Sequence, residues 1–251
     1  MVRNGQCCAC KIRNSLPQNK LNTIGASVTV KLMKVLIASS NPGKLRDFAA
    51  AAALHDVQAE LLPGFRELPE AVEDGQDFAE NARKKSEHYS RYAAGELVLA
   101  DDSGLAVNAL GGAPGIHSAR YAAMRGEDIG NPRQERNSRL EPNGATSVDA
   151  ANNTALLREL AQVGDDRRQA RFVCVISAAK EGREVASFRG EAEGLVLRAP
   201  RGSSGFGYDP LFFFPPLAKT FAELSPAQKM AVSHRGRALR AFLEWCAARH
   251  G

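Results

Sequence analysis

An apolar run that ends abruptly on two adjacent carboxylates is the feature that most limits how this chain can fold. Leu97 to Ala100 is a short apolar run bounded by a glycine and by charges, a pattern typical of a buried β-strand. Asp101 and Asp102 follow it directly. We therefore predict that both carboxylates lie at the carboxyl end of this strand, where open α/β sheets bind ligands and where two carboxylates can hold a hard cation. A solvated Asp-Asp turn is the alternative interpretation.

The composition is that of a soluble globular protein. The chain has 251 residues, of which 44% are hydrophobic and 24% charged, enough to bury the core of one domain. Its net charge of +5 comes from five basic residues and no acidic one within residues 1–32, so the other 28 basic residues equal the 28 acidic ones. This neutral body argues against a nucleic-acid partner.

Residues 1–32 show no sustained periodicity, and we expect a poorly ordered basic extension, with Met33 as a candidate translation start. Three of the five cysteines (Cys7, Cys8 and Cys10) lie there, without the paired spacing of a zinc site or a disulfide framework. The sequence contains neither a signal peptide nor a membrane-spanning run. We therefore predict a cytoplasmic protein that does not bind membranes.

A strand, a polar turn and a helix open the body of the chain. Residues 33–38 predict a buried strand, and the alanine-rich residues 45–54 predict a helix. The turn between them consists of Ser39, Ser40, Asn41, Pro42, Gly43 and Lys44. The N-terminus of a helix favours an anion, and Lys44 can reach a phosphate, although the leading glycine and the Ser or Thr of a P-loop are missing. Simple capping of the helix by Ser40 or Asn41 is the alternative.

An acidic loop precedes the strand that ends on the carboxylates. Residues 57–62 predict a second strand, and residues 68–75 form a loop that contains Glu70, Glu73 and Asp74. From Asp77 to about residue 95, the spacing predicts an amphipathic helix that buries Phe78, Ala82 and Tyr89 and leaves Lys84, Lys85 and Glu87 outside. The loop before this helix can deliver a carboxylate toward Asp101 and Asp102.

The middle of the chain predicts a mixed sheet. Residues 111–121 hold several glycines and a proline and predict an irregular loop, and the polar residues 122–147 predict a surface insertion. Residues 149–163 predict a helix. The β-rich runs 171–179 and 184–197, separated by Glu181-Gly182, predict an antiparallel hairpin.

Two candidate ligand-binding segments lie near the C-terminus. Four glycines surround Phe206 and Tyr208, so the backbone can approach a flat ligand while an aromatic ring stacks on it; a plain turn with core aromatics is the alternative. Residues 225–228 form a capping box, and Lys229 follows on that short helix. His234 and Arg235 open the last helix, where cations oppose the helix dipole, so they suit an anion or a base edge better than they suit stability, unless His234 is merely a surface residue.

Five segments together resemble the non-canonical purine nucleoside triphosphate pyrophosphatases, the inosine triphosphatase (Ham-like) family. These segments are residues 39–44, 100–105, 111–121, 205–209 and 229–236, and the resemblance covers residues 33 to about 248. It implies an α/β fold with three layers (α/β/α), a long twisted mixed sheet and two lobes around a nucleotide cleft. It also implies Mg²⁺-dependent hydrolysis of ITP, dITP and XTP to the monophosphate and pyrophosphate by a homodimer. The expected pyrophosphatase domain is 33–251, interrupted by the insertion at about 122–147.

The resemblance also implies roles for particular residues. Asp102 would be the general base and a Mg²⁺ ligand, and Ser103 would touch the substrate. The triphosphate would lie on Ser39 to Lys44, and the base and phosphates would meet Phe206, Gly207, Tyr208, Asp209, Lys229, His234 and Arg235. A second metal carboxylate is expected in the acidic loop, where Val72 occupies the commonest position, so the assignment falls on the neighbouring Glu73.

Two rival functions remain open at this point. A Maf-like pyrophosphatase acting on modified pyrimidine nucleotides shares the architecture, but Ser233-His234-Arg235-Gly236 and Phe206-Gly207-Tyr208-Asp209 argue against it. A non-catalytic nucleotide- or nucleic-acid-binding module has only the basic extension in its favour.

Overall fold

The computed structural model describes residues 33–52, 57–126 and 146–250. The expected extension 1–32 lies outside the described residues, as do residues 127–145 of the expected insertion. The two ends of that insertion are helical, because Ala122 is buried in one helix and Ser147 begins another. Within the described ranges no helix combines the length and apolar character needed to cross a bilayer.

One mixed sheet of seven strands organises the described part of the chain, in the order β2-β1-β3-β4-β5-β6-β7. The strands are β1 (Met33–Ile37), β2 (Val57–Leu61), β3 (Leu97–Val107), β4 (Gln169–Lys180), β5 (Arg183–Val196), β6 (Phe212–Phe214) and β7 (Lys219–Thr220). Pairing is parallel among β2, β1 and β3 and antiparallel from β3 onward. The predicted mixed α/β sheet is confirmed.

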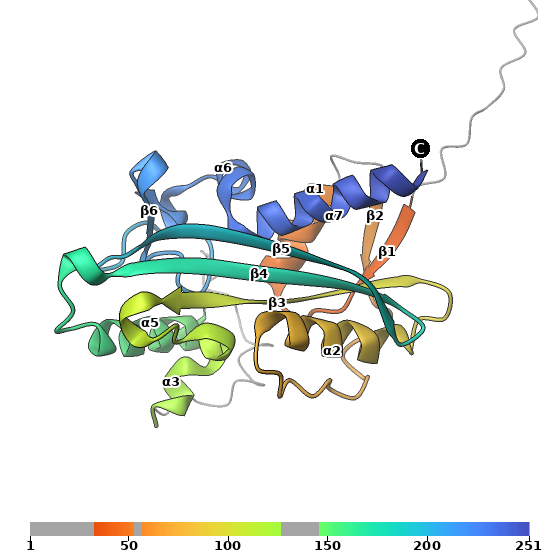
Figure 1. The fold of residues 1–251 in the computed structure, drawn as a ribbon, viewed down its shortest axis with the longest axis horizontal. Coiled ribbons are helices and arrows are strands. Elements are labelled where there is room, and N and C mark those ends of the chain that lie inside the picture. Colours follow the sequence, from red (N-terminus) through yellow and green to blue (C-terminus); the bar gives the residue numbers. More distant parts are fainter. Residues whose placement is uncertain (1–32, 53–56, 127–145, 251) are drawn as a thin grey trace, which may run out of the picture. The chain divides into compact units, whose positions relative to one another are not determined.

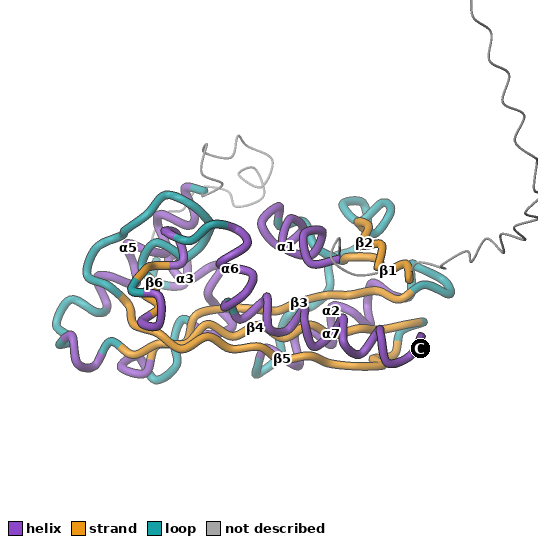
Figure 2. The backbone as a smooth tube through the Cα atoms, turned by 90° about the horizontal axis from the view of Figure 1, so that it is seen from above, coloured by secondary structure: helices purple, strands orange, loops and turns teal. Residues whose placement is uncertain are grey.

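Helices cover both faces of this sheet (Figures 1 and 2). They are α1 (Pro42–Ala52), α2 (Phe78–Ser90), α3 (Tyr121–Met124), α5 (Ser147–Glu159), α6 (Pro226–Val232) and α7 (His234–His250). Alternate residues of β4 separate the two faces, since Cys174 and Ile176 pack in the cluster that contains α1 and α7, whereas Val173 and Val175 pack on α2. The three layers expected from the family resemblance are therefore present.

The strand that carries the two carboxylates is longer than its sequence predicts. The apolar pattern ends at Ala100, but β3 runs on through Asp101 and Asp102 to Val107 and pairs with β4 over this whole stretch. The prediction that the carboxylates lie at the end of their own strand is wrong. They lie instead just beyond the point where β1 stops pairing with β3, because the last parallel pair joins Ile37 to Leu99.

Other elements agree closely with the predictions from local sequence patterns. The predicted hairpin is β4 and β5, and its turn places Glu181 and Gly182 at positive φ, the conformation that a tight hairpin turn requires. The predicted capping box of α6 is present, with the Ser225 hydroxyl accepting from the backbone of Gln228. Helix α1 begins at Pro42 rather than at Leu45, so Gly43 and Lys44 lie in its first turn.

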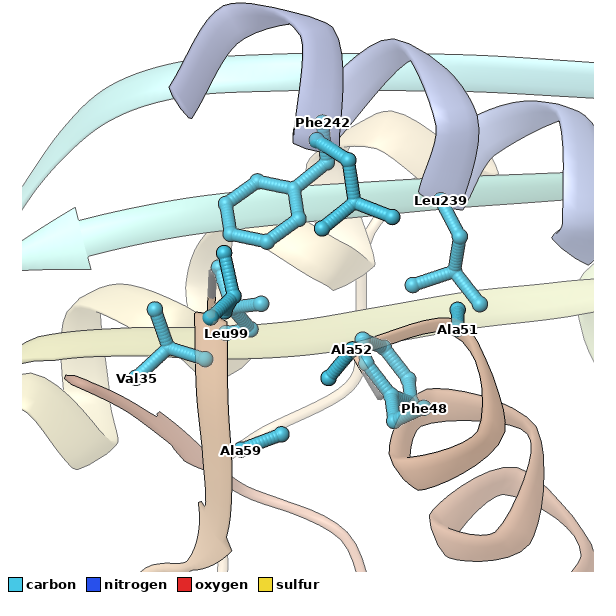
Figure 3. A pocket seen from close by; sticks show the side chains of 10 residues that line it. Val35, Phe48, Ala51, Ala52, Ala59, Leu99, Leu239 and Phe242 are labelled. Atoms are coloured by element: carbon cyan, nitrogen blue, oxygen red, sulfur yellow. The ribbon is translucent and has the colours of Figure 1, made fainter. Parts of the chain in front are cut away.

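The two largest hydrophobic clusters, called the two cores below, lie toward opposite ends of the long strands. One cluster joins α1 and α7 to β1, β3, β4 and β5, and another joins α3 and α5 to the far ends of β3, β4 and β5. Within the first cluster, a cavity of only about 10 Å³ is lined by apolar side chains from α1, α7 and the sheet, including Phe48, Leu99 and Phe242 (Figure 3). It offers no polar partner even to one water molecule and is a packing defect rather than a ligand site.

Candidate active site

Asp101 and Asp102 leave β3 on opposite faces, as successive residues of a strand must. Asp101 lies opposite Ile176 in the register, on the face covered by α1 and α7, and Asp102 lies opposite Val175, on the face covered by α2. Both are buried, with 3% and 7% of their surface exposed. A buried carboxylate requires partners, and each of the two has a different set.

Asp101 is neutralised by two cations from distant parts of the chain. Its carboxylate forms ion pairs with Lys44 at 3.0 Å and with Arg235 at 3.4 Å. Burial acts to raise the pKa of Asp101, but Lys44 and Arg235 together hold it well below the usual value. Asp101 is therefore ionised at any working pH and serves as the fixed counter-charge for both cations.

Arg235 is itself almost fully buried and makes three polar contacts. Its two terminal nitrogens donate to Asp47 at 3.0 Å and to the Ser103 hydroxyl at 2.9 Å, in addition to the pair with Asp101. Because two carboxylates surround the guanidinium, the position of Arg235 in the first turn of α7 costs little stability despite the helix dipole.

The neighbouring His234 stacks on Phe172 at 4.5 Å between ring centroids, and burial lowers the pKa of His234 well below the ordinary value. His234 is thus a neutral core side chain rather than a surface residue.

Asp102 contacts helix α2. Its carboxylate accepts hydrogen bonds from Asn81 at 3.3 Å and from Lys85 at 3.2 Å. Burial raises the pKa of Asp102, and the nearby Glu73 acts in the same direction, while Lys85 and Lys44 oppose it. The two adjacent carboxyls therefore have pKa values shifted in opposite directions, an arrangement that assigns different chemical roles to them.

Glu73 and Asp102 share one cation. The Lys85 ammonium lies 3.1 Å from a Glu73 oxygen and 3.2 Å from an Asp102 oxygen, so both carboxylates converge on one positive charge. The side chain of Val72, the alternative position for a metal ligand, is 69% exposed. No cluster of three or more His, Cys, Asp or Glu side chains suited to a metal occurs in the described ranges. Two carboxylates nevertheless fit Mg²⁺, which takes its remaining ligands from water and substrate phosphates.

The turn from Ser39 to Lys44 is closed by its own side chains. The Asn41 side chain accepts from the backbone N–H groups of Gly43 at 2.9 Å and Lys44 at 3.1 Å, and the Ser39 hydroxyl accepts from Asn41 at 3.2 Å. The capping alternative therefore describes Asn41 correctly, while Ser40 makes no such cap. The Lys44 ammonium lies beside the Asp101 carboxylate, next to Asp102 in the sequence.

The glycine-rich loop brings Phe206 onto this turn. A Cβ atom added to Gly43 would lie 2.5 Å from the Phe206 ring, so only glycine permits this approach. Lys229 and Arg235 lie 4.7 and 5.4 Å from the centroid of the same ring. Asp209 accepts from Phe206 N at 2.9 Å and pairs with Lys229.

The structure brings most of the predicted site residues together but places Tyr208, like His234, among the core side chains. Tyr208 is buried and donates to the Ser118 carbonyl at 2.9 Å, as a core aromatic does. The sequence did not identify Asn81 and Lys85 as site residues. The prediction that Lys85 lies on the exposed face of the helix is wrong, since only 12% of that side chain is exposed. Helical spacing could have found both, because positions 81 and 85 are four apart and share the face of Phe78 and Ala82.

Comparison with known proteins adds an independent observation. A model of the Ham1 family matches residues 35–245. The dITP/XTP pyrophosphatase of Acidobacterium capsulatum is 47% identical over 84% of this chain and 97% of its own, and that of Geobacillus kaustophilus is 44% identical over 83% and 91%. The solved structure of the Staphylococcus aureus Ham1 protein aligns with a TM-score of 0.68 at 36% identity, covering 86% of this chain and 99% of that one.

Proposed function

The chain belongs to the Ham1 family, and we propose that it hydrolyses dITP, XTP and ITP to the nucleoside monophosphate and pyrophosphate. The names of its relatives, dITP/XTP pyrophosphatases at 41–47% identity, support this enzyme class directly. Hydrolysis of this kind removes non-canonical purines from the nucleotide pool before they enter DNA or RNA. The rival Maf-like and nucleic-acid-binding functions receive no such support.

The main support for this proposal is that the two carboxyls of β3 have different partners and pKa values shifted in opposite directions. Asp101 is locked between Lys44 and Arg235, whereas Asp102 has a raised pKa and shares Lys85 with Glu73. A carboxylate with a raised pKa is the stronger base of the two. Asp102 is therefore our candidate general base, and Asp101 is its structural support.

We propose that Asp102 and Glu73 hold Mg²⁺, the position between them being marked by the Lys85 ammonium. When bound, the ion would polarise the phosphoryl oxygens of the substrate and screen their charge.

The reaction needs no protein nucleophile. Asp102 accepts a proton from a water molecule as the water oxygen bonds to the α-phosphorus, and the bond from that phosphorus to the bridging oxygen breaks, releasing pyrophosphate. Lys44 and Lys229 offset the negative charge that develops on the leaving group. Lys44 lies beside Asp101, the neighbour of the candidate base, and Lys229 lies beside the Phe206 ring.

Phe206 is our candidate for the surface on which the purine stacks. Its ring contacts the phosphate turn and two cations, and the glycines on either side of it have positive φ. Ser103, Asp209 and Arg235 supply hydrogen-bonding groups beside it. A site built around one donor and acceptor pattern rejects the wrong base because polar groups would be left unpaired.

A homodimer and a cytoplasmic location stay proposals that rest on the family resemblance. Light scattering of the purified protein during size-exclusion chromatography tests the first. A mass of about twice the 27.0 kDa of one chain supports it, and the mass of one chain contradicts it.

The function is tested by measuring pyrophosphate release from the triphosphates of inosine, xanthosine, guanosine and adenosine, with Mg²⁺ and with a chelator. We expect turnover of the first two at least tenfold above the last two, and none with the chelator. Equal turnover of all four, or turnover of none, would overturn the substrate assignment. Full activity in the chelator would overturn the metal assignment alone.

A further inference from the structure

Helix α5 holds the residue next to Phe206 through its backbone carbonyl. The Asn153 side-chain amide donates to the Gly207 carbonyl at 2.9 Å. Asp149, four residues earlier on the same helix face, lines the same cavity as Gly207. Gly207 has φ of +60°, a conformation that glycine adopts readily, and its carbonyl is held by Asn153.

A cavity separates α5 from much of the loop that precedes Gly207. Its volume is about 380 Å³, and it is lined on one side by Asn153, Thr154 and Leu157 of α5 and on the other by residues 202–207. Tyr208, the next residue, packs in the same hydrophobic cluster as Leu156 of α5, whereas Gly207 itself is joined to α5 beside the cavity by the Asn153 hydrogen bond. This bond lies one residue from the ring that contacts Gly43.

The hydrogen bond needs an amide at position 153. A carbonyl oxygen accepts only from a donor, and the Asn153 Nδ2 atom is that donor. The other end of the amide, Oδ1, is buried and has no hydrogen-bond partner among the described residues. A carboxylate of the same shape would place an acceptor against an acceptor, which is repulsive.

We propose that Asn153 is a positioning residue for purine recognition: by holding Gly207 it fixes Phe206 over the phosphate turn, and so it sets the affinity for the base without taking part in phosphate chemistry. This inference rests on the proposed function. Asn153 lies on α5, whereas the helices and strand that would supply groups to the phosphates are α1, α2, β3 and α6. Losing the bond should therefore weaken the binding of nucleotides and leave the chemical step intact.

The test compares Asn153→Asp and Asn153→Ala with Asn153→Gln and with the control Thr154→Ala. Gln keeps the donor, and the adjoining cavity has room for its extra methylene. Thr154 lines the same cavity but bonds only to its own helix, at Ala150. The measurements are kcat and KM for dITP, the inhibition constant of inorganic tripolyphosphate, which lacks a base, and the melting temperature.

For Asn153→Asp and Asn153→Ala we expect KM for dITP to rise roughly tenfold, the effect of one hydrogen bond, with kcat within about twofold of wild type and the tripolyphosphate constant unchanged. Asn153→Gln should recover most of the affinity, and Thr154→Ala should match wild type. An unchanged KM in both donor-less variants, a fall in kcat alone, or a parallel weakening of tripolyphosphate would overturn the inference. Absence of dITP turnover by wild-type protein would instead overturn the proposed function.

Discussion

Two neighbouring residues, Asp101 and Asp102, illustrate how burial and partners separate identical side chains. Asp101 faces Lys44 and Arg235, and Asp102 faces Asn81 and Lys85. The first has a lowered pKa and the second a raised one. We therefore expect that replacing Asp102 mainly lowers activity and that replacing Asp101 mainly lowers stability.

Replacing Asp102 removes the candidate base without removing the binding groups. We expect Asp102→Asn to lower kcat on the order of 10²- to 10⁴-fold, the usual contribution of a general base. Binding of dITP, measured by calorimetry, should persist because Lys44, Lys229 and Phe206 are untouched. A variant that retains the wild-type rate would remove Asp102 from this role, and its thermal unfolding serves as the control for folding.

Replacing Asp101 should instead damage stability. Asp101→Asn leaves the buried Arg235 and the partly buried Lys44 without their shared counter-charge, a loss that typically costs about 3–5 kcal/mol at a buried pair. Because the pKa of Asp101 is lowered in the folded state, its stabilisation is complete above its unfolded pKa of about 3.9 and is lost as the pH falls through the folded value.

Urea unfolding of wild type and Asp101→Asn at several pH values tests this prediction. The difference in unfolding free energy should be constant from pH 7 to pH 5 and should shrink below about pH 4. Asp74→Asn is the matched control, since Asp74 pairs with Lys84 on the surface and its loss should change stability little. A difference that grows toward low pH would contradict the assignment.

Helix α2 influences the candidate base because it places the Lys85 ammonium beside Asp102. Lys85 acts to lower the pKa of Asp102, so its removal should raise that pKa further. We therefore expect Lys85→Gln to move the acidic limb of the pH profile of kcat/KM to higher pH and to reduce activity at pH 7 on the order of tenfold or more.

Lys84→Gln is the neighbouring control for Lys85→Gln. Lys84 pairs with Asp74 and Glu80 at the surface and touches neither carboxylate of β3. Its pH profile should overlay that of wild type. If both variants shifted equally, the effect would belong to the net charge of α2 rather than to the contact with Asp102.

Local signals predicted elements well and long-range pairing poorly. The capping box of α6 and the β4–β5 turn were readable because their partners lie within a few residues. The extension of β3 past Ala100 was not readable, because Asp101 is tolerated in a strand only through Lys44, 57 positions before it, and Arg235, 134 positions after it. No local pattern contains that information. The same reason hid the contact of Asn153 with Gly207, 54 positions apart.

At the scale of the whole molecule, the site draws its groups from both cores of the sheet. The phosphate turn belongs to β1 and α1, and the aromatic loop belongs to the segment between β5 and β6. They meet where Phe206 lies on Gly43, next to the Lys44 that pairs with Asp101 of β3. Substrate binding therefore depends on how these two parts are held together, which gives the sheet a role in recognition as well as in stability.

The boundaries of the catalytic unit provide the last prediction. The family model begins at residue 35, and the strands and helices that make up both cores begin at Met33. We therefore propose that a protein of residues 33–251 keeps the melting temperature of the full chain and its kcat/KM for dITP within about twofold. Because residues 1–32 carry five basic and no acidic residues, the shortened protein should also elute earlier from a cation exchanger at pH 7. A large loss of activity with normal folding would show that residues 1–32 contribute to the site.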